Sequence, residues 1–142
     1  MTTAAELLQY KGREVFSISP DATVLEALQI MNDRNIGALL VIENGQVVGI
    51  ISERDYARKV ILYGRASKST QVGDIMSKSF FSVAPNTPAD ECMGIMTEKR
   101  VRHLPVFENK KLVGLISIGD VVRGMIADRE FTIVQLGRYI AS

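Results

Sequence analysis

Residues 47–55 read Val-Val-Gly-Ile-Ile-Ser-Glu-Arg-Asp, and residues 112–120 read Leu-Val-Gly-Leu-Ile-Ser-Ile-Gly-Asp. In both stretches an apolar run with high β propensity ends at a serine, and an aspartate follows three residues later. The pattern predicts a buried strand that runs directly into a helix. The two stretches belong to a longer repeat, because residues 15–61 align on residues 80–126 without a gap. The chain therefore holds two copies of one structural unit, which we expect to pack on each other.

The composition limits the classes of protein to consider. With 142 residues the chain has the length of about one domain. Each repeat alone is close to the size at which a core becomes marginal, so we expect a shared core about a pseudo-two-fold axis. No apolar run is long enough to span a bilayer and no secretory signal opens the chain, so we expect a cytoplasmic protein. The net charge of +1 gives no attraction to nucleic acid or to an anionic membrane, and we expect neither as a partner.

The single cysteine excludes an intrachain disulfide and fits a reducing compartment. Cys92 lies in an apolar helical phase with Ile95 and Met96, which predicts a buried and unreactive thiol. One histidine and one cysteine cannot build a zinc site, and the sequence has no G-x-S-x-G, phosphate-loop or G-x-G-x-x-G motif. We therefore expect no enzymatic activity, no catalytic residues, no metal and no catalytic cofactor.

The periodicity predicts the order β-α-β-β-α in each repeat, which gives an α/β (α+β) fold with two small three-stranded sheets and packed helices. The expected elements of the first repeat are a strand at 15–18, a helix from an N-cap at Thr23 to about Arg34 that Gly37 breaks, a hairpin of 38–42 and 47–51 around Asn44-Gly45, and a helix at 53–63. Those of the second repeat are a strand at 80–83, a helix from an N-cap at Thr87 to about Arg100, a hairpin of 103–107 and 112–116 around Asn109-Lys110, and a helix capped by Ser117. Residues 4–10 look like a short leading helix, and residues 128–140, with apolar Phe131, Val134 and Ile140, like a helical tail that docks on the body.

The repeated Ser-x-x-Asp turns, Ser52 to Asp55 and Ser117 to Asp120, have two interpretations. Serine at an N-cap with aspartate at the third helical position is a favourable cap, which needs no ligand. A helix start of this kind can also hold a polyol or a phosphate, because the hydroxyl and backbone N–H groups can face outward and the carboxylate can accept two hydroxyl hydrogens. A vicinal diol such as a ribose suits that carboxylate.

With these turns, further motifs give the chain a family resemblance. It resembles a tandem pair of CBS domains, the arrangement called a Bateman module, over about residues 8–127. The resemblance implies repeats at 8–64 and 73–127, an inter-repeat linker at 65–79 and a tail at 128–142. The marks are the prolines after each first strand (Pro20 and Pro85), Leu-Leu-Val-Ile at 39–42, Leu-Pro-Val-Phe at 104–107, and Val-Gly-Asp-Ile-Met at 72–76.

The resemblance implies a non-catalytic regulatory module for signal transduction that binds adenine nucleotides in clefts between the repeats. Candidate ligands are AMP, ADP, ATP, NAD(H) and S-adenosylmethionine. Asp55 and Asp120 would contact the ribose diol, with Ser52 and Ser117 near the ribose or phosphate. The residues that would line the pockets are Ser17, Ile18, Ile36, Gly37 and Ala38 of the first repeat, and Ser82, Val83, Val101, Arg102, His103 and Pro105 of the second.

The two copies differ at the expected sites, which predicts two unequal pockets. Arg102-His103 stands where the first repeat has Gly37-Ala38, so the pocket with Asp120 would favour a nucleotide phosphate. The pocket with Asp55 would have Arg54 at its edge. The alternative for His103 is a half-buried histidine that packs and hydrogen-bonds locally. Further basic residues that could reach a phosphate are Arg13, Arg58 and Lys78.

Three functional hypotheses follow. A nucleotide sensor would act through its own dimer or on a separate target enzyme, with the ligand favouring one relative orientation of the repeats. A scaffold that only dimerises or docks on a partner would use both aspartates as helix caps. A small hydrolase would need a nucleophile and base that the sequence does not show. We expect a homodimer, because the family's modules assemble as discs of four repeats and because the apolar phases of 24–31 and 92–96, with Met93, Met96 and Met125, exceed the needs of one thin core.

Overall fold

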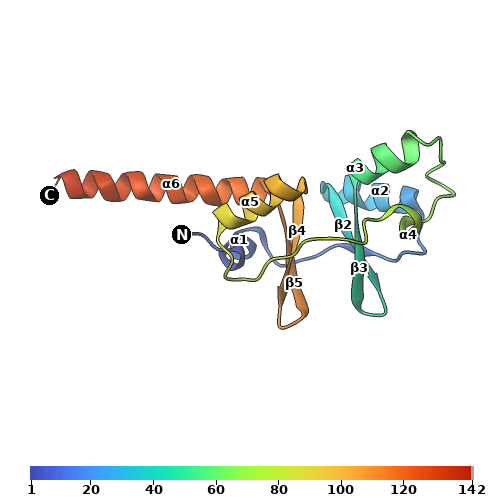
Figure 1. Ribbon diagram of the computed structural model, residues 1–142, viewed down its shortest axis with the longest axis horizontal. Coiled ribbons are helices and arrows are strands. Elements are labelled where there is room, and N and C mark those ends of the chain that lie inside the picture. The colour runs from blue at the N-terminus through green and yellow to red at the C-terminus, as the bar shows by residue number, and fades with distance from the viewer. Residues whose placement is uncertain (142) are drawn as a thin grey trace. The chain divides into compact units, whose positions relative to one another are not determined.

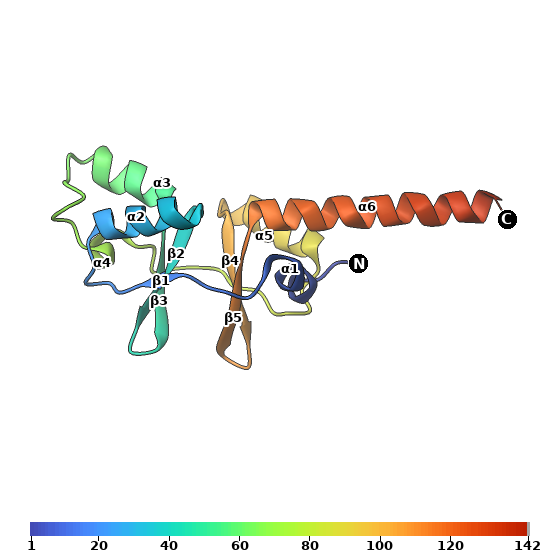
Figure 2. The ribbon, with the colours of Figure 1, turned by 180° about the vertical axis from the view of Figure 1, so that it is seen from behind.

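The computed structural model describes the backbone of residues 1–141 and the side chains of residues 1–138. The chain divides into two compact units, each built around one repeat (Figures 1 and 2). Residues Val15–Phe80 form one unit, and Met1–Glu14 joins the chain from Phe81 onward in the other. The leading helix is therefore part of the second repeat's unit. The boundaries at 8–64 and 73–127, the linker and the shared core stay predictions.

The first-repeat unit has a three-stranded sheet in the order β1-β2-β3, as predicted. Strand β1 runs parallel to β2, and β2 and β3 form the antiparallel hairpin around Asn44-Gly45. Both turn residues have positive φ, as a two-residue hairpin turn requires. The elements are β1 (Ser17–Ile18), α2 (Val24–Arg34), β2 (Ala38–Glu43), β3 (Gln46–Ser52), α3 (Glu53–Asp55), the π-helix η1 (Tyr56–Ile61) and α4 (Val72–Ile75).

Helix α2 begins at the predicted capping box. The Thr23 hydroxyl accepts from the Glu26 N–H at 3.2 Å, and the Glu26 carboxylate accepts from the Thr23 N–H at 3.1 Å. The helix ends at Asn35, which adopts the left-handed conformation, so the break comes two residues before the expected Gly37. The face that packs into the core contains Val24, Ala27 and Met31.

The second-repeat unit contains α1 (Ala4–Lys11), α5 (Ala89–Lys99), β4 (His103–Glu108), β5 (Lys111–Ser117) and α6 (Ile118–Ala141). Its sheet has two strands, so the predicted strand at 80–83 is wrong in extent. Only Val83 forms a bridge, and it pairs with Val106. The reason lies in β4. In the first repeat the Leu40 N–H donates to the Phe16 carbonyl, whereas the corresponding Pro105 has no N–H to extend the pairing.

Two further predictions for the second repeat are wrong. Pro88, and not Thr87, is the N-cap of α5, and the Thr87 hydroxyl accepts instead from the Ala84 N–H at 3.1 Å. The tail is helical and continues α6 without a break. Asp128 at its start accepts from the Thr2 N–H at 2.9 Å, but the apolar side chains of the tail that were expected to dock are not buried in the described part of the chain. Phe131 and Val134 are exposed, and the side chain of Ile140 lies outside the described residues. Among the residues that the structure describes, no helix combines the length and apolarity needed to cross a bilayer.

Helix α1 completes the core of the second-repeat unit. Leu7 and Leu8 are buried with Val106 and Ile116. The approach is close, because a Cβ added at Gly114 would lie 2.5 Å from Leu8 Cδ2. The side chain of the first helix therefore fills a space that a glycine in β5 leaves open.

The cysteine and methionines of the second repeat pack against its own core. Cys92 is buried, as predicted, and burial raises the pKa of its thiol to about 11. Met96 is buried, and Met93 and Met125 pack against the same cluster. The expected surplus of apolar side chains at 92–96 is therefore used inside the unit, and it gives no support for a dimer.

Candidate functional site

The first Ser-x-x-Asp turn is a complete capping box at the end of β3. The Asp55 Oδ2 atom accepts from the Ser52 N–H at 2.9 Å and from the Ser52 hydroxyl at 3.1 Å. The Ser52 hydroxyl accepts in turn from the Asp55 N–H at 3.3 Å. The N–H of Glu53 donates to the Gly37 carbonyl, so two of the first helical N–H groups bind inside the protein. This turn satisfies the helix start without any ligand, as the capping interpretation requires.

Two residues that the sequence interpretation missed complete the surroundings of Asp55. Its Oδ1 atom accepts from the Ser77 hydroxyl at 3.3 Å and lies 3.2 Å from Lys59 Nζ. Lys59 Nζ also donates to the Ile75 carbonyl at 2.9 Å. Lys59 follows Asp55 by four residues, and that helical spacing is the signal that could have found it.

The second turn repeats this geometry at the end of β5. The Asp120 Oδ2 atom accepts from the Ser117 N–H at 2.7 Å and from the Ser117 hydroxyl at 3.0 Å. The Ser117 hydroxyl accepts from the Asp120 N–H at 3.3 Å. The Ile118 N–H donates to the Arg102 carbonyl, which matches the contact from Glu53 to Gly37. The repeat therefore reproduces the turn atom by atom, although the surrounding side chains differ.

Asp120 binds two cations from different elements. Lys11, the last residue of α1, places Nζ 2.8 Å from Asp120 Oδ2, and Arg123 donates through Nη2 to Oδ1. Lys11 Nζ also donates to the Leu115 carbonyl at 2.8 Å. Burial acts to raise the pKa of Asp120, but the hydrogen bonds from Lys11 and Ser117 outweigh it and hold that pKa below its ordinary value.

Among the described side chains, each carboxylate therefore has at least four hydrogen-bonding or ionic contacts. Asp55 contacts Ser52 twice, Ser77 and Lys59. Asp120 contacts Ser117 twice, Lys11 and Arg123. An ionised carboxylate offers about four lone-pair sites. A diol that binds either aspartate must consequently replace some of these partners.

His103 begins β4 and pairs with Ser117 across the hairpin. It is half-buried, as the packing interpretation expected. Burial, the largest cause, and the charges of Lys11 and Arg102 together lower the pKa of its imidazole to about 4, although Asp120 acts to raise it. His103 is therefore neutral at pH 7. It could donate a hydrogen bond to a phosphate, but it would add no charge.

In the first-repeat unit the structure brings the predicted site residues of β2 to the Asp55 turn. Ala38 pairs with Ser52, and Gly37 binds the start of α3 through its carbonyl. Ile18 is buried in the core, and Ile36 packs against the same cluster, so both side chains contribute mainly to packing. Ser17 is exposed on β1.

In the second-repeat unit Arg102 reaches the Asp120 turn through its carbonyl, and its side chain is exposed. Val101 is half-buried and packs against the core. Val83 is buried, its N–H donates to the Pro105 carbonyl and its carbonyl accepts from Phe107, so the backbone that was expected to line a pocket is engaged by β4. Ser82 is exposed and Pro105 is buried.

The remaining predicted basic residues are exposed. Arg54 follows the first residue of α3, and Arg58 lies in η1 of the same unit. Arg13 belongs to the unit of the second repeat, and Lys78 to the unit of the first. The described hydrogen bonds and ion pairs of Asp55 and Asp120 do not include the side chains of Arg13, Arg58 or Lys78.

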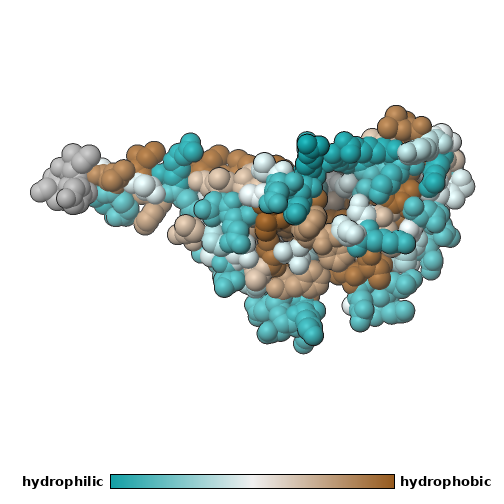
Figure 3. Space-filling view, in the orientation of Figure 1, coloured by the Kyte–Doolittle hydropathy of each residue, from teal (hydrophilic) through white to brown (hydrophobic). Residues whose placement is uncertain are grey.

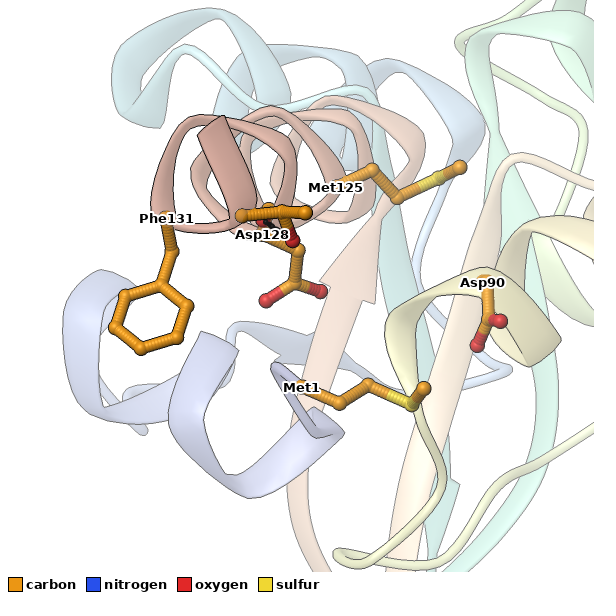
Figure 4. Close-up of a pocket in the computed structure, with 6 residues that line it drawn as sticks. Met1, Asp90, Met125, Asp128 and Phe131 are labelled. Atoms are coloured by element: carbon orange, nitrogen blue, oxygen red, sulfur yellow. Dashed lines mark hydrogen bonds between the residues drawn. The ribbon is translucent and has the colours of Figure 1, made fainter. Parts of the chain in front are cut away.

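A shallow pocket of about 370 Å³ lies elsewhere in the second-repeat unit (Figure 4). Its polar lining includes Asp128, about two turns beyond Asp120 on α6. The Thr2 N–H and hydroxyl already donate to that carboxylate at 2.9 and 2.7 Å. None of the predicted site residues lines it. The lining residues are Met1, Asp90, Met125, Asp128, Phe131 and Thr132.

Two repeats define the class, each with a helix, a β-hairpin and a Ser-x-x-Asp turn that opens the next helix. The family model of the CBS domain matches residues 6–61 and again residues 72–127. The chain belongs to the CBS-domain family, whose members are regulatory proteins.

Relatives support this assignment over most of the chain. The mitochondrial CBS domain-containing protein CBSX3 of Arabidopsis thaliana is 40% identical over 98% of this chain and 72% of its own length. The CBS domain-containing protein YhcV of Bacillus subtilis is 32% identical over 76% of each. A CBS-domain protein from Burkholderia ambifaria has a solved structure with a TM-score of 0.86 and 47% identity, covering 89% of this chain and 96% of its own.

Proposed function

We propose that this chain is a non-catalytic regulatory module that binds an adenine nucleotide through Asp55 and Asp120. The observation that supports the proposal most is the duplicated turn. Each repeat places a buried carboxylate at the junction of a strand and a helix, with the Ser52 N–H 2.9 Å and the Ser117 N–H 2.7 Å from Oδ2. Buried carboxylates at matching places in both copies are costly to maintain for capping alone, since an exposed cap stabilises a helix equally well.

The chemistry of the ligand follows from the carboxylates. An ionised aspartate is an acceptor only, so it suits a group with two adjacent donors, and a ribose diol is such a group. The CBS domain pair of protein MJ0100, which shares this fold with a TM-score of 0.79 and 21% identity, was solved with 5′-methylthioadenosine and S-adenosyl-L-methionine. That complex supports only the capacity of the fold for adenosine derivatives. AMP, ADP, ATP, NAD(H) and S-adenosylmethionine remain the candidate ligands.

The two sites are proposed to be unequal. Lys11 and Arg123 contact Asp120 in the second repeat, where Arg102-His103 also stands in place of Gly37-Ala38 of the first repeat. The Asp120 site should therefore prefer ligands with more phosphate charge. Binding at either site would favour one conformation of the module and so report the nucleotide level to a target enzyme. A homodimer and a cytoplasmic location belong to the same proposal.

Calorimetric titration of AMP, ATP, NADH and S-adenosylmethionine tests this function. Asp55→Asn and Asp120→Asn keep the shape of each side chain and remove its charge. Glu26→Gln is the matched control, because Glu26 completes a capping box of the same kind on α2. We expect binding to wild type and to the control, and a loss of at least tenfold in affinity at the site of each aspartate variant. Equal binding by all four proteins would refute the assignment of the sites.

A docking scaffold is the second candidate, and the completeness of both caps favours it. Each carboxylate already has at least four contacts inside the protein, so neither turn needs a ligand. If no adenine compound at millimolar concentration raises the melting temperature, the scaffold becomes the better account.

A further inference from the structure

The positive charge of the side chains on Asp120 exceeds the single negative charge of its carboxylate. Lys11 and Arg123 both contact its carboxylate, so the three groups together have a formal charge of +1. The charge of Arg102 also acts on this part of the unit, because it helps to lower the pKa of the neighbouring His103. Arg102 therefore adds to the positive potential near Asp120. A cluster with surplus positive charge is suited to a second anion.

The partners of Asp120 differ in how easily they can leave it. The Ser117 N–H and hydroxyl belong to the cap, and their loss would leave the start of α6 unsatisfied. Lys11 and Arg123 have side chains that are 31% and 57% exposed, whereas that of Asp120 is 4% exposed. Water can solvate these two cations once they leave the carboxylate, whereas the buried Asp120 needs new hydrogen-bond donors in their place. A ligand that supplies such donors can therefore exchange with the two cations.

We propose that Lys11 and Arg123 form a phosphate subsite beside Asp120 and exchange partners when the ligand binds. The ribose diol takes their places on the carboxylate, and the two cations bind the phosphate of the same ligand. Ammonium and guanidinium groups both pair well with phosphate oxygens, so a nucleotide replaces the contacts that it breaks. A nucleoside without phosphate breaks the same contacts and replaces none. The inference rests on the proposed function.

The exchange would also reach α1. Lys11 is the last residue of that helix, and its ammonium holds the Leu115 carbonyl as well as Asp120. The next residue, Gly12, has a φ of +100° and no atom near its Cβ position, so the chain there can move without a clash. Movement of Lys11 would therefore loosen the end of α1, which makes occupancy of the site detectable at the N-terminal helix.

Calorimetry with AMP and adenosine in an Asp55→Asn background tests the subsite at Asp120 alone. Lys11→Met and Arg123→Met remove the charges, and Lys111→Met is the control, since Lys111 is exposed at the opposite end of the β4–β5 hairpin. With the native cations we expect AMP to bind at least tenfold more tightly than adenosine. Each of the two variants should reduce the ratio of AMP affinity to adenosine affinity, because adenosine binds more tightly and AMP more weakly than to the protein with both cations. The control should keep the ratio.

The possible outcomes distinguish failure of the phosphate subsite from failure of the proposed nucleotide binding. AMP binding that Asp120→Asn abolishes, with a ratio unchanged by Lys11→Met and Arg123→Met, overturns the subsite and leaves the function standing. Absence of AMP and adenosine binding overturns both. Hydrogen exchange gives an independent reading, since AMP should speed the exchange of the amides of residues 8–12 in the Asp55→Asn protein. Unchanged or slower exchange there contradicts the release of Lys11.

A second and independent observation concerns an apolar stripe on α6, which we define as Val122, Ile126, Ile133 and Leu136. These side chains are 40% to 61% exposed. Their spacing of four, seven and three residues places them on one face, as in the seam of a coiled coil, with Arg129 at the intermediate position. The C-terminal half of α6 extends past α1 and α5 (Figure 1), and apolar side chains lie along it (Figure 3). An unpaired helix of this length is marginal in water.

We infer that the stripe pairs with the same stripe of a second copy, in antiparallel orientation. The charges on α6 favour the antiparallel orientation of the second copy. Parallel pairing would set Arg129 against its own copy, which is repulsive. Antiparallel pairing about an axis near residue 131 brings Ile126 to Leu136 of the partner subunit and Arg129 near Glu130 of the partner subunit. The stripe is therefore self-complementary in one orientation only.

Light scattering after size-exclusion chromatography tests the pairing. We expect a dimer for wild type, a monomer for Ile133→Glu, and a dimer for the control Val134→Glu, which changes an exposed apolar residue outside the stripe. A mixture of Ile126→Cys and Leu136→Cys chains should oxidise to the mixed disulfide. A wild-type monomer, an Ile133→Glu dimer, or efficient self-linking of Ile126→Cys would each overturn the antiparallel pairing.

Discussion

Lys11 Nζ lies 2.8 Å from Asp120 Oδ2, and this ion pair joins the N-terminal helix to the strand-to-helix turn of the second repeat. The contact is long-range in sequence and sits at the carboxylate that the proposed function needs. It also explains in part why the pKa of Asp120 is lowered despite burial. The stability of the unit and the properties of the site therefore depend on the same group.

The lowered pKa of Asp120 predicts an acid-dependent loss of stability. A carboxyl with a folded pKa below its unfolded value, near 3.8, contributes stability that is present above that value and is lost as pH falls through the folded pKa. Asp120→Asn should lower the unfolding free energy by about 1–3 kcal/mol at pH 7. Thermal melts from pH 7 to pH 3 should show that the stability difference between wild type and Asp120→Asn is constant down to about pH 5 and becomes smaller below pH 4. A difference of constant size down to pH 3 would contradict the lowered pKa.

His103 gives a direct spectroscopic prediction, because it is the only histidine in the chain. Its folded pKa of about 4 lies below the unfolded value of 6.5, so the folded protein gains stability from the neutral ring above pH 6.5 and loses it as pH falls from 6.5 toward 4. Proton NMR should show one imidazole resonance that titrates near pH 4. A midpoint near 6.5 would show that the ring is solvated.

Gly49 in β3 should not tolerate a side chain. A Cβ at this position would lie 2.9 Å from the Ser77 carbonyl oxygen, which accepts from the Ile50 N–H. Gly49→Ala should therefore cost about 1–3 kcal/mol in urea unfolding. Gly94→Ala is the control, since it has open space within α5 and should stabilise by about 0.5–1 kcal/mol. The same effect from both substitutions would argue against the close approach at Ser77.

Leu8 tests whether α1 belongs to the core of the second repeat. It is 1% exposed and packs in the cluster with Val106 and Ile116. Leu8→Ala should lower the unfolding free energy by about 2–5 kcal/mol, because it leaves a cavity. Tyr10→Ala, on the exposed side of the same helix, should change it by less than about 0.5 kcal/mol. Urea unfolding measures both changes. A small effect of Leu8→Ala would show that α1 is not part of this core.

Local signals account for what could be predicted from sequence. The capping box at Thr23 and the hairpins at Asn44-Gly45 and Asn109-Lys110 depend on neighbouring residues, and the structure contains all three. The two Ser-x-x-Asp turns are local in the same sense. The repeat itself then gave the fold class, since each copy supports the assignment of the other.

Contacts between distant segments could not be predicted in this way. Lys11 reaches Asp120 because α1 packs in the second-repeat unit, and no local pattern in residues 4–10 indicates which repeat it joins. The short pairing at Val83 could have been predicted from Pro105. Pro105 aligns with Leu40 of the first repeat but lacks the N–H with which Leu40 pairs with the first strand. The tail was expected to dock, but apolar phase alone does not distinguish an intramolecular contact from a surface for a partner.

The most direct measurement of the central claim compares the affinities of AMP and 2′,3′-dideoxy-AMP for the wild-type protein. If Asp55 and Asp120 accept the ribose diol, removal of both hydroxyls should weaken binding by at least about 10- to 100-fold, the value of one hydrogen bond to a charged group. The preference should disappear in the Asp55→Asn, Asp120→Asn double variant. Equal affinity of wild type for the two ligands would contradict recognition of the diol and leave both aspartates as helix caps.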